Sequence, residues 1–170
     1  MEAACIIHRE AELPPEKFRK FAEDLGELCP YLKDSHVDML GPDWEGDPIL
    51  DEKCVDFRCG GNLDWDDTGF GVDDSLDDDG DNFDAGDMSM MAALDDYSRK
   101  NTACGVDGLY EYPITYMHEA VQMAIVIAEH HLRGHIRVTS HKWNKGAFGD
   151  AIEFVKFHLG YGDDFRIGIP

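Results

Sequence analysis

Hydrophobic residues recur at helical spacing along residues 18–29, and charged side chains lie mostly on the opposite face. Pro14 and Pro15 precede this stretch, and proline suits the first turn of a helix because its missing N–H is not needed there. The pattern predicts an amphipathic helix that ends at Pro30.

Two further apolar stripes at helical spacing lie in the last third of the chain. The first predicts a largely buried helix over residues 115–132, with Thr115 as its cap and Gly134 just after its end. The second predicts a helix over residues 148–159 that stops at Gly160.

Short stretches with β-compatible or alternating composition separate these helices. They predict strands at residues 3–8, 36–40, 53–58, 135–139 and 165–169. The resulting order favours an α+β fold in which a small mixed sheet is packed by about three helices, with a long Asp-rich loop or insertion. A length of 170 residues fits a single domain spanning residues 1–170.

The insertion is residues 59–98, which contain no Lys or Arg and thirteen acidic residues, all of them Asp. This stretch therefore carries −13 of the formal net charge of −21. Asp and Gly favour turns, so a long loop is expected, with a short helix over residues 88–97 capped by Asp87 or Ser89. The candidate partner-binding residues are Asp64, Trp65, Asp66, Asp67, Phe70, Asp73, Asp74, Asp77, Asp78, Asp79, Asp81 and Asp84.

The centre of the insertion approaches the charge density of a single nucleic-acid strand. Residues 73–81 hold six Asp in nine positions. At a strand rise of roughly 3.3 Å this is about one charge per 5 Å, against about 3.4 Å for single-stranded DNA. Mimicry of a polyanion is therefore geometrically possible.

The charge balance also excludes partners. A net charge of −21 opposes direct binding to nucleic acid or to an anionic membrane, and it favours basic proteins. Five cysteines, an odd number, without a basic N-terminal region indicate reduced thiols and a cytoplasmic protein.

These observations favour a non-enzymatic acidic binding protein without a cofactor. It would place the Asp-rich segment in the basic nucleic-acid-binding groove of a partner protein and block it. Phage and plasmid inhibitors of restriction enzymes and CRISPR complexes share this size and charge, so an anti-defence role in a viral setting fits the composition.

Two alternatives stay open. The oxygens of residues 75–79 followed by Gly80 resemble the start of a calcium loop, although Gly86 stands where the bidentate Glu is required. The second alternative is a small metal-dependent hydrolase. His118-Glu119 begins like a zinc-protease motif but has Gln122 in place of the second ligand. Other candidate ligands are His130, His131, His135, His141, Cys54 and Cys59.

Overall fold

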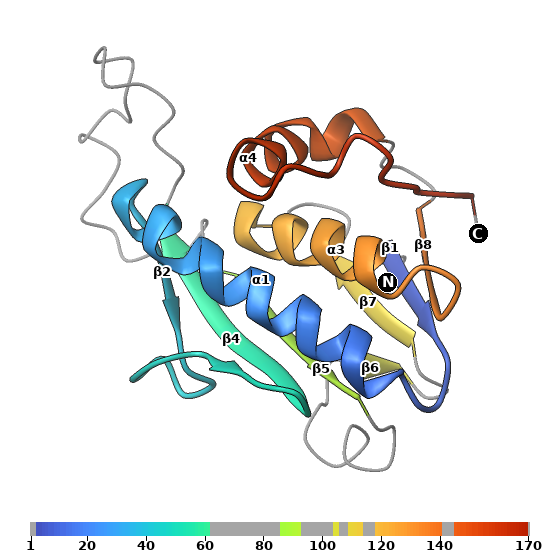
Figure 1. Cartoon of the computed structure of the whole chain (residues 1–170), viewed down its shortest axis with the longest axis horizontal. Coiled ribbons are helices and arrows are strands. Elements are labelled where there is room, and N and C mark those ends of the chain that lie inside the picture. Colours follow the sequence, from blue (N-terminus) through green and yellow to red (C-terminus); the bar gives the residue numbers. More distant parts are fainter. Residues whose placement is uncertain are drawn as a thin grey trace.

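The computed structural model describes residues 3–61, 86–92, 104–105, 109–113, 118–140 and 145–169. The predicted α+β class is confirmed. Three helices lie on one side of the strands (Figure 1): α1 (Pro15–Asp34), α3 (Glu119–His131) and α4 (Gly149–Leu159), the last preceded by a 3-10 turn at Lys145–Phe148. Helix α3 lies between α1 and α4 and packs against both.

The strands form two antiparallel sheets where one small mixed sheet was expected. In the first sheet the order is β6 (Cys104–Gly105), β7 (Leu109–Pro113), β1 (Ala3–Arg9) and β8 (Ile136–Thr139). In the second, β2 (Val37–Leu40) and β3 (Ile49–Leu50) share one edge of β4 (Cys54–Gly61), and β5 (Gly86–Met91) pairs with β4 along the other edge. Every ladder between these strands is antiparallel.

Helix α1 confirms the first apolar stripe but does not end at Pro30. It continues for one more turn to Asp34, with Pro30 inside it. Leu28 and Leu32 lie on either side of Pro30 and are both fully buried. Burying a leucine stabilises by roughly 1.5–3 kcal/mol, which offsets much of the loss of one helical hydrogen bond.

Helix α3 is buried nearly all round, as its wide apolar stripe predicted. It begins at Glu119 and its cap is His118, so the prediction of a start at Thr115 was wrong; Thr115 itself lies outside the described residues. Gly134 follows the helix with φ +89°, and Gly160 ends α4 with φ +84°, as expected for glycines after a helix.

Regular apolar periodicity, confined to residues 3–29 and 112–170, predicted that these two regions form the fold core and that the acidic insertion is peripheral. This predicted core was too small. Val121, Ile125, Ile152 and Val155 are buried as expected, but the second sheet adds its own buried side chains. These are Val37, Cys54, Val55, Phe57, Cys59, Met88 and Met90. Residues 86–91 are a core strand, so the helix expected over 88–97 was wrong: pairing with β4 overrides a weak local preference.

The strand expected over residues 165–169 was also wrong. This segment makes a single parallel bridge, between Thr139 and Gly168, and Phe165 packs its ring 4.9 Å from that of Phe148. One backbone hydrogen bond links the segments that follow β1 and β5, one strand from each sheet: the N–H of Leu13 donates to the carbonyl of Ala92 at 2.7 Å.

Candidate functional site

The twelve predicted partner-binding residues all lie in residues 62–85, outside the described residues. The structure does describe both ends of this stretch. Gly61 is the last residue of β4, Gly86 is the first residue of β5, and Gly86 pairs with Cys59. The Asp-rich stretch is therefore an insertion of 24 residues between two neighbouring antiparallel core strands. We call residues 62–85 the acidic segment.

The start of the acidic segment is fixed by a close main-chain approach. Gly61 has φ +90°, and a Cβ atom at this position would lie 2.0 Å from the carbonyl oxygen of His36. His36 itself has φ +63°, a conformation that few residues other than glycine adopt. Only glycine fits at position 61, because any side chain would collide with the turn that joins α1 to β2.

His118 ties the same point to α3. Its Nδ1 accepts the backbone N–H of Ala120 at 3.1 Å, so its Nε2 carries the proton and donates to the carbonyl oxygen of Gly61 at 2.8 Å. The ring is 1% exposed, so this bond is shielded from water. One side chain thus caps α3 and holds the end of β4 against it. We call Gly61, His36 and His118 the base of the acidic segment.

An exposed tryptophan lies on the loop that borders the same strand. Trp44 joins β2 to β3, is 45% exposed and has φ +63°, which is unusual for a bulky residue. The backbone N–H of Trp44 donates to the backbone carbonyl of Gly41, which helps to hold this conformation. Asp43, Glu45 and Asp47 on the loop are exposed. The structure therefore presents an aromatic side chain among carboxylates on a second loop beside β4.

The one basic residue of β4 is engaged. Arg58 lies with Nη1 3.2 Å from the Asp56 carboxylate and also donates to the carbonyl of Phe57. Its charge is therefore already matched within the strand, close to the residue where the acidic segment begins.

The histidines proposed as metal ligands point to separate partners. Asp24 Oδ2 lies 2.6 Å from His131 Nε2 and accepts the hydroxyl of Tyr161 at 2.5 Å, whereas His135 pairs with Glu10. His130 instead stacks on Tyr161 with ring centroids 3.7 Å apart. Burial and the Asp24 hydrogen bond raise the pKa of Tyr161 well above its ordinary value. This cluster joins α1, α3 and the C-terminal segment, and no metal-binding group of three occurs within the described ranges; His141 lies outside them.

The cysteines do not form the proposed pair. Cys54 and Cys59 are five residues apart on one strand, which points their side chains to opposite faces. Burial raises the pKa of Cys5 to about 12 and that of Cys29 to about 11, so neither thiol is a nucleophile near neutral pH. The calcium-like residues 75–80 lie outside the described part of the chain.

No family model, no curated protein and no solved structure matches this chain. Among the residues that the structure describes, no helix combines the length and apolar character needed to cross a membrane.

The base of the acidic segment was missed from sequence. Its three residues are separated by 25 and 57 positions, and each is an ordinary residue in its own local context. The glycine pair at positions 60 and 61, at the end of a predicted strand, was the available signal, since glycine in a strand often marks a close backbone approach.

Proposed function

We propose that this protein is a non-enzymatic acidic binding protein that presents its acidic segment to the basic, nucleic-acid-binding groove of a partner protein and blocks it. One observation carries the proposal. Ten Asp and no Lys, Arg or Glu occupy the 24 residues between two paired core strands, so this insertion holds −10 of the net charge of −21. Such a concentration of like charge opposes folding unless an oppositely charged partner offsets it.

The base supports this function because it fixes where the charge begins. Both ends of the acidic segment leave from one side of one sheet, and main-chain contacts hold the first of them against α1 and α3. A partner would therefore meet the charge at a defined place on a rigid body. Fixing the attachment point lowers the ordering cost that binding must overcome.

Trp44 gives the proposed interface an apolar anchor. Exposed tryptophans within a charged surface are frequent hot spots, since a large ring loses its water contacts when it enters a pocket. Its left-handed backbone conformation costs of order 1–3 kcal/mol, and such strain occurs preferentially at functional sites. We expect Trp44 and the exposed carboxylates of its loop to add to the surface that meets the partner.

The test is competition for proteins that a polyanion resin retains. A cell lysate is loaded on heparin, and the retained proteins are eluted with this protein at about 0.15 M salt and at about 0.5 M salt, where the Debye length shrinks from about 8 Å to about half of that. We expect this protein to elute a small set of nucleic-acid-binding proteins at the lower salt concentration. At the higher concentration it should no longer bind or elute them. Each eluted protein should then release labelled DNA or RNA when this protein is added.

Two variants of equal charge change make the test specific. The first replaces Asp77, Asp78, Asp79 and Asp81 with Asn, which keeps the size and turn preference of Asp. The control replaces four exposed carboxylates outside the acidic segment with Gln, at Glu12, Glu16, Glu27 and Glu153. We expect the first variant to lose the partner and the control to keep it.

Unchanged, salt-insensitive elution by the Asn variant would overturn the proposal. A different result would redirect it. If calcium raises the melting temperature of the unmodified protein, and the Asn variant loses that rise, residues 75–81 bind a divalent cation instead.

A further inference from the structure

Arginines gather around one groove of this acidic protein. The groove has a volume of about 630 Å³ and lies among β1, β8, the end of α3 and residues 166–168. Four of the seven arginines in the chain line it, together with two histidines. These six residues are Arg9, Arg133, Arg137, Arg166, His8 and His135. We call it the arginine groove.

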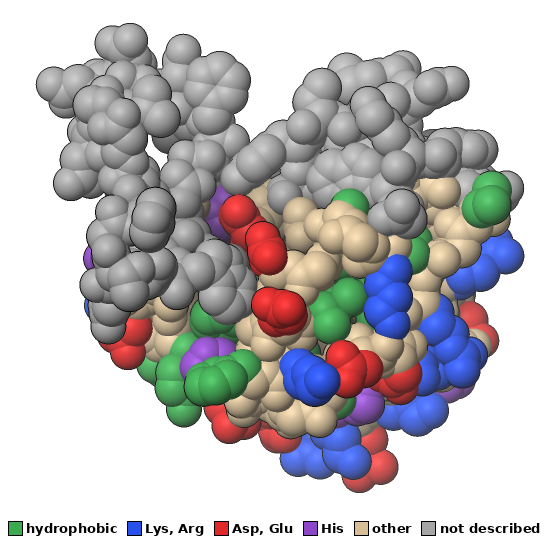
Figure 2. Space-filling view, turned by 90° about the horizontal axis from the view of Figure 1, so that it is seen from above, with side chains coloured by type: hydrophobic (Ala, Val, Ile, Leu, Met, Phe, Trp, Pro, Cys, Tyr) green, Lys and Arg blue, Asp and Glu red, His purple; other side chains and the backbone are tan. Residues whose placement is uncertain are grey.

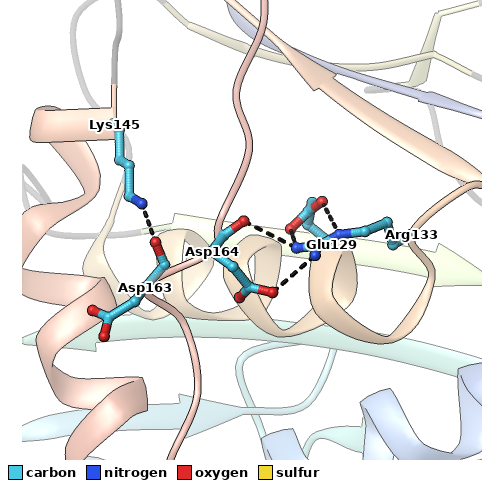
Figure 3. Close-up of polar contacts among 5 residues, drawn as sticks. All are labelled: Glu129, Arg133, Lys145, Asp163 and Asp164. Atoms are coloured by element: carbon cyan, nitrogen blue, oxygen red, sulfur yellow. Dashed lines mark hydrogen bonds and ion pairs between the residues drawn. The ribbon is translucent and has the colours of Figure 1, made fainter.

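The two carboxylates that line the groove each have a partner side chain. Glu129 is buried and receives two hydrogen bonds from the guanidinium of Arg133, at 2.9 and 2.7 Å. Arg133 also donates to Asp164 at 2.8 Å (Figure 3), and these bonds raise its pKa well above the ordinary value. Glu10 lies 2.7 Å from His135. Glu129 is therefore paired with a permanently charged side chain, whereas the histidine beside Glu10 carries a charge only when it is protonated.

The C-terminal wall of the groove is held in place from both sides. Asp164 binds Arg133 through its carboxylate and its carbonyl, and the carbonyl of the neighbouring Asp163 accepts a hydrogen bond from Lys145 (Figure 3). The Asp163 carboxylate also forms an ion pair with Lys156. The segment that carries Arg166 is thus fixed to α3 and α4 before any ligand arrives. A site built on such support needs little reorganisation to bind.

Two guanidinium groups are left over. The side chains of Arg137 and Arg166 are exposed, and neither guanidinium makes a hydrogen bond or ion pair with any residue in the described part of the chain. This is unusual where 36 acidic residues face 15 basic ones. Arg9 also lines the groove, and its guanidinium donates to the carbonyl oxygens of Glu10, Ala11 and Ala92. The lining therefore has an excess of positive charge.

Arg137 and His8 face the groove from neighbouring strands. They are directly opposite in the β1–β8 ladder, so their side chains share one face of the sheet. Burial, and then the charge of Arg137, lower the pKa of His8, which shows that the two side chains are close enough to interact. Ile167, which is half-buried, adds apolar surface to the lining; Ile136 and Val138 also border the groove, but their side chains are buried.

We propose that the arginine groove binds a phosphate group, either as free phosphate or on a small phosphate ester, through Arg137 and Arg166. The planar guanidinium donates two parallel hydrogen bonds to a phosphate, and two such groups match its double negative charge. The volume falls in the range of small-molecule sites, and the apolar wall suits the organic part of an ester.

The groove lies away from the base of the acidic segment. In Figure 1, β8 is at the right, whereas β2 and the end of β4 that pairs with it are at the left. Lys and Arg side chains gather toward the right-hand side of Figure 2, the same side of the molecule. Screening over a Debye length of about 8 Å separates the two fields at physiological salt.

Calorimetric titration at constant ionic strength tests the proposal. The probes are inorganic phosphate, ribose 5-phosphate and succinate, a dicarboxylate of equal charge. We expect saturable binding of at least one phosphate probe and weaker or no binding of succinate. Tighter binding of ribose 5-phosphate assigns the site to esters, and equal binding assigns it to free phosphate.

Variants at exposed positions keep the fold while removing the contacts. Arg137→Gln and Arg166→Gln should each weaken phosphate binding by about tenfold or more, as expected for losing a charge-assisted hydrogen-bond pair. Arg137→Lys keeps the positive charge but loses the planar fork of donors. Its affinity for phosphate should therefore fall between that of the unmodified protein and that of Arg137→Gln. Arg19→Gln, on the exposed face of α1, is the matched control and should bind like the unmodified protein.

The proposal is overturned if neither phosphate probe binds up to about 10 mM, which corresponds to a free energy weaker than about 3 kcal/mol. It is equally overturned if succinate binds as tightly as phosphate, or if both Gln variants bind as the control does. Circular dichroism of each variant checks that the fold is unchanged.

Discussion

The base of the acidic segment adjoins a negatively charged stretch of chain, whereas arginines line the arginine groove, and the two regions are built by different means. Main-chain atoms dominate at the base: a glycine against a carbonyl oxygen, and a histidine that donates to a carbonyl. At the groove, charged side chains hold one another, with Glu129, Arg133 and Asp164 in one network. The contrast shows that a strongly charged surface can be positioned without opposing charges, which would neutralise it.

This difference has a practical consequence. Ion pairs weaken as salt rises, whereas main-chain packing does not depend on ionic strength. The contacts that hold the arginine groove should therefore weaken at high salt before those of the base do. Variants in the two regions should therefore differ in how their stability depends on salt and in how much stability they lose.

Ile125→Ala should have the largest effect and should damage both regions together. Ile125 is fully buried in α3, which contacts β5 near the base and β8 near the groove. Removing three buried carbons should lower the free energy of unfolding by about 2 to 5 kcal/mol. Urea denaturation measures this loss. A change below about half a kcal/mol would contradict the central place given to α3.

Arg133→Met should act on the groove alone. It leaves Glu129 buried without its partner, and this should cost about 3 kcal/mol in urea denaturation. The double variant Arg133→Met with Glu129→Leu removes both charges and should recover most of the loss. If the double variant is no more stable than the single one, the ion pair is not what holds this end of α3.

Gly61→Ala should act on the base alone. The added Cβ must move away from the His36 carbonyl and also adopts a positive φ, so we expect a loss of at least about 2 kcal/mol. Gly160→Ala is the control, since it has φ +84° but no atom within 4 Å of the added Cβ. It should lose only about 1 kcal/mol. Equal losses in the two variants would mean that the close approach to His36 has no energetic weight.

The smallest effect is expected from the Asn variant at positions 77, 78, 79 and 81. Removing four negative charges relieves self-repulsion, so its melting temperature at low salt should equal or exceed that of the unmodified protein. The difference should vanish at about 0.5 M salt, where the charges are screened. A clear loss of stability at low salt would indicate that these side chains make contacts within the fold.

Sequence patterns predicted the elements whose local preference and tertiary role agree. Helix α1, helix α4 and strand β8 follow their apolar periodicity. Strand β5 does not, because Gly, Asp and Ser have little strand preference and pairing with β4 decides its conformation. Residues 165–169 show the opposite case, since their alternating pattern meets the edge of β8 at a single bridge, between Thr139 and Gly168.

The candidate sites were predictable only in part. The concentration of Asp is visible in the composition, but the base depends on His36, Gly61 and His118 meeting across the fold. The arginine groove likewise needs Arg166 to return to the β1–β8 ladder from the far end of the chain. Neither arrangement has a local pattern, so spacing along the sequence cannot reveal it.

The pairing of Cys59 with Gly86 also bears on how this protein can evolve. The free-energy cost of closing a chain between two fixed ends grows only with the logarithm of its length, and doubling the length adds about 0.6 kcal/mol. This closure cost alone would therefore change little if the number of Asp between residues 61 and 86 changed. Natural selection could tune the total charge to a changing target while the scaffold beneath it stays the same.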